Sequence, residues 1–326
     1  VAGGNLVIGI IVLIWLFSGN YKAKFNQIIS NKLAVLSILF FSLHVLGLIW
    51  TDDIKWGLTI VKKMSDFLFL LPILLTITKK EYIKYYISAF ILAMTLTEVL
   101  SYLVWFEIIG PLHRATVGNP TPTMSHISYN LYLTFGIYLI SHELLRNKSL
   151  SAVSKYFYAF FALTMSINMF ITGGRAGQVM FFAMITILIF QYYNPKRIKA
   201  AVLTMIIVPS IFMSAYSLSP QFNNRVNDAI DNISSYNDEG KRDTSVGQRI
   251  TYTLNSFKII QQNPLFGVGT GDFPDEYKKV HMNNTPDVGL TVNPHNMYIL
   301  TTVQLGVLGL ASRSEERRVG KECRSR

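Results

Sequence analysis

The sequence is poor in charged residues for its length. Only 15% of its 326 residues are Asp, Glu, Lys or Arg, whereas 50% are apolar and 13% are aromatic. A soluble domain carries about 25% charged residues. The composition therefore excludes an ordinary soluble enzyme and directs attention to the long apolar runs.

Cysteine is almost absent, and the single one, Cys323, lies in a C-terminal string of different composition. Residues 313–326 read RSEERRVGKECRSR and resemble the translation of a sequencing adapter, so we expect them to be foreign to the fold. They contribute six basic and three acidic residues, which is +3 of the formal charge of +11. Without them the chain has no cysteine, which excludes disulfides, a thiol nucleophile and cysteine-bound metal. Because the chain starts at Val1, we also expect residues upstream of it.

Long apolar runs recur along the chain, and crossing a bilayer takes roughly 17–25 residues each. In lipid such runs must be helical, because backbone donors have to be satisfied within the segment. The predicted fold is therefore all-α, a polytopic helical membrane bundle with one large external loop. The nine predicted spans are 2–18, 33–50, 58–78, 85–106, 124–141, 156–171, 178–193, 200–217 and 295–311.

The connections between these runs alternate in positive charge. The basic set contains twelve Lys or Arg residues, whereas the intervening short connections and their flanks contain five, among them Arg114 and Arg175. The positive-inside rule places the basic set in the cytoplasm. Residues 1–217 then hold eight transmembrane helices, 218–294 form the external loop, and 295–312 enter the membrane again.

The external loop has three parts of different character. It opens with a polar stretch that we expect to be flexible. Thr244 or Ser245 then caps a helix with Val246, Ile250, Phe257 and Ile260 on one face, ending near Asn263-Pro264. The following PLFGVGTGDF predicts a tight turn with positive backbone angles. It is not a nucleotide loop, because the Lys-Ser/Thr ending and a preceding strand are missing.

Three residues carry the chemical interpretation, although each has an ordinary structural alternative. Arg175, in TGGRAG at the external end of a helix, is either an interfacial arginine or a ligand for an anion. Arg249, early in the loop helix, is either a solvated charge or a second anion ligand. His295, in NPHNMYIL, either satisfies the start of a helix or acts as a general base near neutral pH.

Together these motifs resemble one family. HNMYILTTVQLGVLG, with its His-Asn pair followed by Gly306 and Gly309, resembles the histidine motif of the O-antigen ligases and related O-antigen polymerases. TGGRAG resembles the family's arginine motif. QRITYTLNSFKIIQQNPLFGVGTGDF resembles the stretch in which an arginine leads a helix into a Pro-Leu-Phe-Gly-x-Gly turn.

The resemblance implies a C-type glycosyltransferase of the bacterial inner membrane that works on its periplasmic face. The implied donor is a glycan on undecaprenyl diphosphate, which Arg175 and Arg249 would hold through bidentate guanidinium contacts. His295 would take the proton of an acceptor hydroxyl, for example on lipid A–core, in an inverting displacement. Asn296 and Arg114 are possible supporting residues. Gly306 and Gly309 are expected to let helices approach closely.

The same resemblance implies no cofactor and no metal, and the sequence has no carboxylate-rich cluster that would invite one. Membrane lipids are expected partners, and nucleic acid is not. Two alternatives stay open: a polymerase, whose acceptor is the next lipid-linked repeat unit, and a transporter of lipid-linked glycans. A transporter favours internal repeats with sites at the membrane midplane. Because no repeat is evident and the candidates gather at the external face, we favour an enzyme, and among enzymes a ligase.

Overall fold

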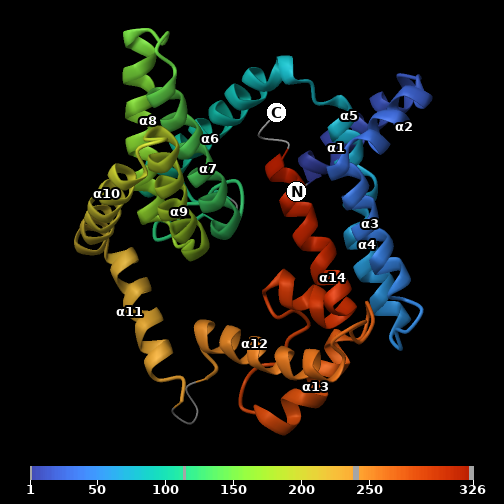
Figure 1. The fold of residues 1–326 in the computed structure, drawn as a ribbon. Coiled ribbons are helices and arrows are strands. Elements are labelled where there is room, and N and C mark those ends of the chain that lie inside the picture. Colours follow the sequence, from blue (N-terminus) through green and yellow to red (C-terminus); the bar gives the residue numbers. More distant parts are fainter. Residues whose placement is uncertain (1, 113–114, 238–241, 323–326) are drawn as a thin grey trace. The chain divides into compact units, whose positions relative to one another are not determined.

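The computed structural model describes residues 2–112, 115–237 and 242–322 (Figure 1). Its described residues form helices and turns, with one isolated β-bridge between Thr116 and Asn119. The all-α prediction is confirmed. The chain forms two compact units, Glu81–Asp231 and a second built from Val1–Lys80 and Asn232–Arg326.

The unit built from the chain's two ends contains eight α-helices that lie wholly within it. Helix α14 packs against α3 and carries α12 and α13 beside it. A small core of aromatic and aliphatic side chains, including Tyr252, Phe273 and Tyr277, joins α12 and α13 to α14. The bounds are α1 Ala2–Phe17, α2 Tyr21–Ser30, α3 Lys32–Leu46, α4 Ile54–Leu68, α5 Leu70–Ile77, α12 Ser245–Gln262, α13 Phe273–Asn284 and α14 Met297–Glu322.

The middle unit is organised around α7, which packs against both α8 and α9. Its core includes Tyr129, Leu133, Met165 and Phe181, all nearly inaccessible to solvent. A short 3-10 helix, Lys80–Tyr82, leads into this unit. The bounds are α6 Ile83–Trp105, α7 His126–Arg146, α8 Ala152–Ile171, α9 Arg175–Tyr192, α10 Arg197–Leu218 and α11 Pro220–Ser234, the last of which crosses the boundary between the units.

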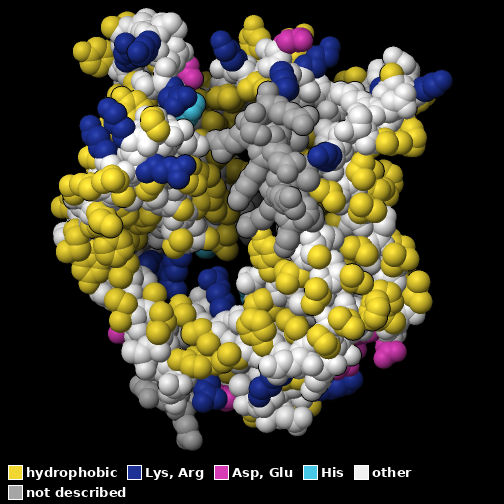
Figure 2. Space-filling view, in the orientation of Figure 1, with side chains coloured by type: hydrophobic (Ala, Val, Ile, Leu, Met, Phe, Trp, Pro, Cys, Tyr) yellow, Lys and Arg dark blue, Asp and Glu magenta, His cyan; other side chains and the backbone are white. Residues whose placement is uncertain are grey.

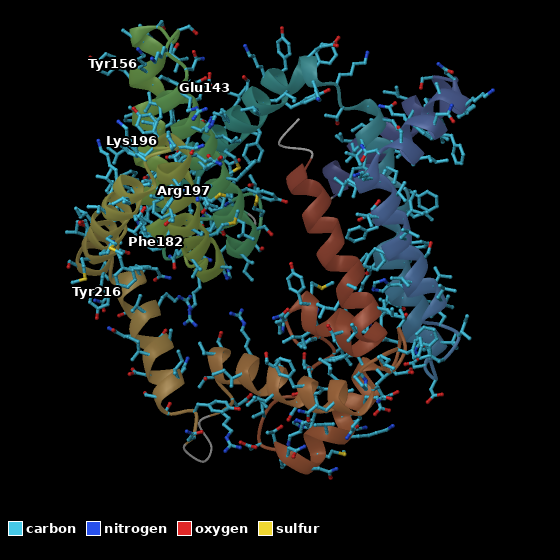
Figure 3. The ribbon with its side chains drawn as sticks, in the orientation of Figure 1. Glu143, Tyr156, Phe182, Lys196, Arg197 and Tyr216 are labelled. Atoms are coloured by element: carbon cyan, nitrogen blue, oxygen red, sulfur yellow. The ribbon has the colours of Figure 1, made fainter. Side chains whose placement is uncertain are left out.

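Helices α7 to α10 of the middle unit run back and forth, so alternate connections share an end (Figure 1). At one end the Arg146 Nη1 donates to the carbonyl of Gln191 at 3.3 Å. At the other end the Ser219 hydroxyl donates to the carbonyl of Phe170 at 2.7 Å. Figure 3 shows Glu143 in the upper part of this unit and Tyr216 at the lower end of α10. The basic connections 147–151 and 193–196 therefore lie together, while their side of the membrane stays a prediction.

Three described helices are long and apolar enough to cross a membrane: Lys80–Trp105, Arg175–Tyr192 and Arg197–Leu218. A fourth span results if the bent pair Leu6–Phe17 and Tyr21–Ser30 counts as one, although its parts meet at 116°. Hydrophobic side chains cover the outer flank of α10 (Figure 2), where Met205 is 75% exposed. Such a patch requires an apolar surrounding. The predicted number of nine spans stays a prediction.

The apolar run 58–78 is two helices rather than one. Helix α4 ends at Leu68 and α5 begins at Leu70. Pro72 has no backbone N–H and cannot donate to the Leu68 carbonyl, and its ring crowds that carbonyl. The break therefore follows from a local signal within the run.

The opening of the predicted external loop is helical over Pro220–Ser234, which differs from the flexible stretch expected there. Pro220 occupies the first position of α11, where its missing N–H costs nothing, and the Ser219 hydroxyl accepts from the Phe222 amide at 3.1 Å. Phe222 is 4% exposed, and its ring lies 5.1 Å from that of Phe170. This apolar anchor gives α11 the tertiary packing that short helices need.

Candidate functional site

The loop helix α12 begins where the sequence predicts. Thr244 is its N-cap, and the threonine hydroxyl accepts a hydrogen bond from the Gly247 amide at 3.2 Å. The helix ends at Gln262, immediately before Asn263-Pro264. The predicted bounds are confirmed.

The buried face of α12 differs from the predicted apolar face. Phe257 is 48% exposed, whereas Thr251, Asn255 and Ser256 are buried. The Asn255 amide group donates to the Thr285 hydroxyl at 2.8 Å and to the Tyr277 hydroxyl at 3.3 Å. Hydrogen bonds to Tyr277 within α13 and to Thr285 at its C-cap thus satisfy the buried Asn255.

The segment 285–296, which carries His295, is hydrogen-bonded to the start of α12 through Asp243. The Asp243 carboxylate accepts from the Gln248 side chain at 2.7 Å and from the Gly289 amide at 3.1 Å. These two hydrogen bonds lower the pKa of Asp243. Val288 is 3% exposed and belongs to the core shared by α12, α13 and α14. A backbone hydrogen bond at Gly289 and the packing of the Val288 side chain therefore both stabilise the segment.

His295 lies outside α14, which begins two residues later than the predicted span. Its backbone is left-handed, with φ of 57°, and its amide donates to the Asn293 side chain at 2.8 Å. The imidazole is exposed and stacks on the ring of Tyr252, with centroids 6.1 Å apart and planes at 29°. Burial, followed by the nearby charge of Asp243, raises the pKa of Tyr252. His295 therefore presents an accessible ring on an aromatic support.

Asn296 serves as a cap for α14. Its side-chain oxygen accepts from the amides of Tyr298 at 3.0 Å and Ile299 at 3.4 Å. The cap fixes the backbone that follows His295. The other loop histidine, His281, is 6% exposed and stacks on Tyr277, which suits a core residue.

Arg249 is exposed on α12, three residues before Tyr252. Residues three apart on a helix are surface neighbours. Arg249 thus lies one turn from the tyrosine on which His295 stacks. The folded loop brings the neighbourhoods of two predicted site residues together, although 46 positions separate them in the sequence.

The glycine-rich turn is a structural connection, as predicted. Gly267 has φ of 68°. The amides of Val268 and Gly269 donate to the carbonyls of Val303 at 2.8 Å and Gln304 at 3.0 Å. These carbonyls are available because α14 is non-helical at Gly306.

Gly306 permits this interruption. Its φ is 63°, and a Cβ there would lie 2.1 Å from the Leu265 carbonyl oxygen. The expected close approach is confirmed at Gly306, but its partner is the glycine turn rather than another helix. At Gly309 a Cβ would instead meet Leu305 and Thr301 of α14 itself.

The turn at Asp52 and Asp53 contacts this same region. The Asp272 carboxylate accepts from the amides of Asp52 at 2.9 Å and Asp53 at 2.8 Å. Asp53 also caps α4 by accepting from the Trp56 amide at 2.9 Å. The Asp52 side chain is exposed, whereas the Asp53 side chain has this capping role.

Arg175 belongs to the middle unit, where it is the first residue of α9. Its Nη2 lies 3.5 Å from a carboxylate oxygen of Asp228 on α11, and its side chain is 24% exposed. Gly177 lets α9 approach α7, since a Cβ there would lie 2.3 Å from that of Asn130. The motif TGGRAG thus allows α9 to pack closely against α7 and places Arg175 at the first position of α9.

A second arginine near this motif was missed from the sequence. A Cβ on Gly173 would lie 3.3 Å from Nη2 of Arg225. The Gly173 amide donates to the Asn119 side chain at 3.2 Å, and Asn119 lies 3.4 Å from the ring of His126. Arg225 and Asp228 are three positions apart on α11, a spacing that could have pointed to a shared surface. The predicted supporting residue Arg114 lies outside the described residues.

Within the described residues, no group of three or more His, Cys, Asp or Glu side chains could hold a metal ion. Tyr252 and Asp243, which support the histidine segment, were not predicted. An aromatic and a carboxylate at the start of a helix give no signal of that role in the sequence.

The apolar helices and this loop define an integral membrane protein. Residues 160–312, a little under half of the chain, match the family described as O-antigen ligase, and this match confirms the resemblance. Arg175, Arg249 and His295 all lie inside the match. The chain is also 25% identical over 320 residues to an uncharacterized protein of Haemophilus influenzae, covering 93% of this chain and 75% of that protein.

Proposed function

We propose that the protein transfers a glycan from undecaprenyl diphosphate to a hydroxyl of an acceptor such as lipid A–core, on the periplasmic face of the inner membrane. The observation that supports this most is the stacking of His295 on Tyr252, one turn of α12 from Arg249. A base and a cation on one folded loop suit a displacement at an activated sugar. The family match supports the same class of chemistry.

In the proposed step, the imidazole of His295 accepts the proton of the acceptor hydroxyl. The hydroxyl oxygen attacks the anomeric carbon of the donor sugar while the bond from that carbon to the phosphate oxygen breaks. Undecaprenyl diphosphate leaves with the electron pair, and the configuration at the anomeric carbon inverts. General-base assistance of this kind contributes roughly 10²–10⁴-fold to a rate.

The guanidinium groups of Arg249 and Arg175 bind the diphosphate in this proposal. A guanidinium presents parallel N–H donors that match phosphate oxygens and keeps its charge throughout the physiological pH range. Such fixed donors also stabilise the negative charge that grows on the leaving group. With two arginines in this role, the proposed reaction needs no metal, so EDTA should leave transfer unchanged.

The test uses His295→Gln in membranes at matched protein levels, with His142→Gln on α7 as the control. Glutamine can form a hydrogen bond but cannot accept the proton, so we expect His295→Gln to lose transfer and His142→Gln to keep it. Substantial transfer by His295→Gln would refute the base. Offering lipid A–core and a lipid-linked repeat unit as separate acceptors distinguishes a ligase from a polymerase.

A further inference from the structure

The face of α12 opposite Arg249 borders a cavity of about 490 Å³. Lys258 lies nine residues after Arg249, which is two and a half turns of about 3.6 residues, so it faces the other way. The cavity is of the size that holds small ligands. It is therefore separate from the side of α12 that bears Arg249.

The cavity combines cations, a carboxamide and apolar surface. Its walls include Tyr236, Arg242, Leu254, Phe257, Lys258 and Gln261, and none of its lining residues is acidic. Phe257 and Leu254 are 48% and 50% exposed. These two exposed apolar side chains lie on a polar loop helix, beside the buried Thr251 and Asn255 that also line the cavity.

The cations are held in place by their neighbours. The Arg242 guanidinium lies 5.7 Å from the Tyr236 ring centroid, and its Nε donates to the Tyr236 carbonyl at 3.3 Å. The Lys258 ammonium donates to the Asn284 side chain at 2.5 Å. Neither cation has an ion pair with a described acidic residue. Among the described residues, the hydrogen bonds of both cations thus go to uncharged oxygens.

A smaller hollow of about 210 Å³ shares Lys258 and Asn284 with the first, and its lining includes the ion pair of Glu276 and Lys279. An elongated ligand could thus extend from one into the other past the lysine. The ligand chemistry that fits has hydroxyls for the carboxamides, a C–H face for Phe257 and a negative charge for the two cations. A carbohydrate chain with acidic groups has all three.

We propose that this cavity binds an acidic sugar of the glycan that the enzyme handles. The inference rests on the proposed function for the origin of the glycan, but the binding can be measured without transfer. The acidic sugar belongs either to the donor glycan or to the acceptor, which present the same chemistry.

The binding test uses the full chain in detergent with digalacturonate as the probe and its methyl ester as the neutral counterpart, followed by saturation-transfer NMR. Arg242→Gln and Lys258→Gln should each weaken digalacturonate binding about tenfold or more, as expected for a hydrogen bond to a charged group. Phe257→Ala should weaken both probes. Lys278→Gln, an equal charge change on an exposed residue of α13 outside the cavity, should weaken neither.

Failure of the native chain to bind digalacturonate, equal binding of the ester, or an equal loss in Lys278→Gln would overturn the proposal. His295→Gln should bind the probe normally, so loss of the proposed base and loss of the cavity are distinguishable. In transfer assays, Lys258→Gln should raise KM at least severalfold for either donor or acceptor, which identifies the source of the sugar. An unchanged KM for both would overturn the link to transfer.

Discussion

Replacing Gly306 by alanine tests whether the glycine turn and the interruption of α14 depend on each other. The new Cβ would meet the Leu265 carbonyl oxygen at 2.1 Å, so the turn must move away. This movement would break three backbone hydrogen bonds, in which the amides of Val268, Gly269 and Val307 donate to the carbonyls of Val303, Gln304 and Pro264, respectively. At about 1 kcal/mol each, they contribute about 3 kcal/mol. Left-handed backbone adds about 1 kcal/mol for alanine.

The expected local loss of about 4 kcal/mol corresponds to amide exchange roughly a thousandfold faster. Hydrogen exchange measured by mass spectrometry on the peptide 264–272 would report it in the solubilised protein. Gly9→Ala is the matched control, because a Cβ there has no atom within 4 Å. Unchanged exchange in 264–272 of the Gly306→Ala variant would refute the reasoning.

Three further results are expected. Arg175→Lys and Arg249→Lys should each lose most transfer at normal expression and insertion, because lysine keeps the positive charge but lacks the parallel N–H donors of a guanidinium. Full transfer by either variant would remove the substituted arginine from the donor site. On a Cys323→Ser background, Ser234→Cys should react with an impermeant thiol reagent in whole cells and Ser149→Cys should not, whereas the reverse labelling would contradict the orientation. Hydrogen bonds from Gln248 and Gly289 lower the pKa of Asp243. At a pH above the ordinary pKa of aspartate, the ionised carboxylate therefore stabilises the segment 285–296. This stabilisation is lost as the pH falls through the lowered pKa. Acidification should therefore lower the protection of the amides in 285–296, measured as exchange relative to the intrinsic rate at each pH, and Asp243→Asn should remove this pH dependence of the protection.

Local signals were sufficient for the helical class and for the ends of α12. Thr244 and Pro264 act on residues within a turn of themselves, so their effect is visible in the sequence. The buried face of α12 depends instead on Thr285 and Tyr277, which lie 30 and 22 positions from Asn255. Apolar periodicity finds only the apolar part of a buried face, and the buried face of α12 combines the apolar Tyr252 and Ile259 with hydrogen-bonded polar residues such as Asn255.

The candidate site shows the same division. His295 and Arg249 were identifiable because their residue types are suited to proton transfer and anion binding. Tyr252 at helical spacing reads as a core residue, and its contact with His295 depends on the fold of 285–296. The interruption at Gly306 likewise depends on the amides of Val268 and Gly269, which donate to the carbonyls of Val303 and Gln304, 35 positions later in the sequence.

The contact of Arg175 with Asp228 has two interpretations that can be separated. As a structural anchor, the pair would join α9 to α11. However, Asp228 is 57% exposed and the two atoms are 3.5 Å apart, and such exposed pairs contribute about 0–1 kcal/mol. Little would then oppose the exchange of this carboxylate for a diphosphate with more charge. If the pair is only an anchor, Asp228→Asn and Arg175→Gln should have equal effects on stability and transfer. If Arg175 binds the donor, Asp228→Asn should keep transfer while Arg175→Gln loses it, and equal loss in both variants would favour the anchor.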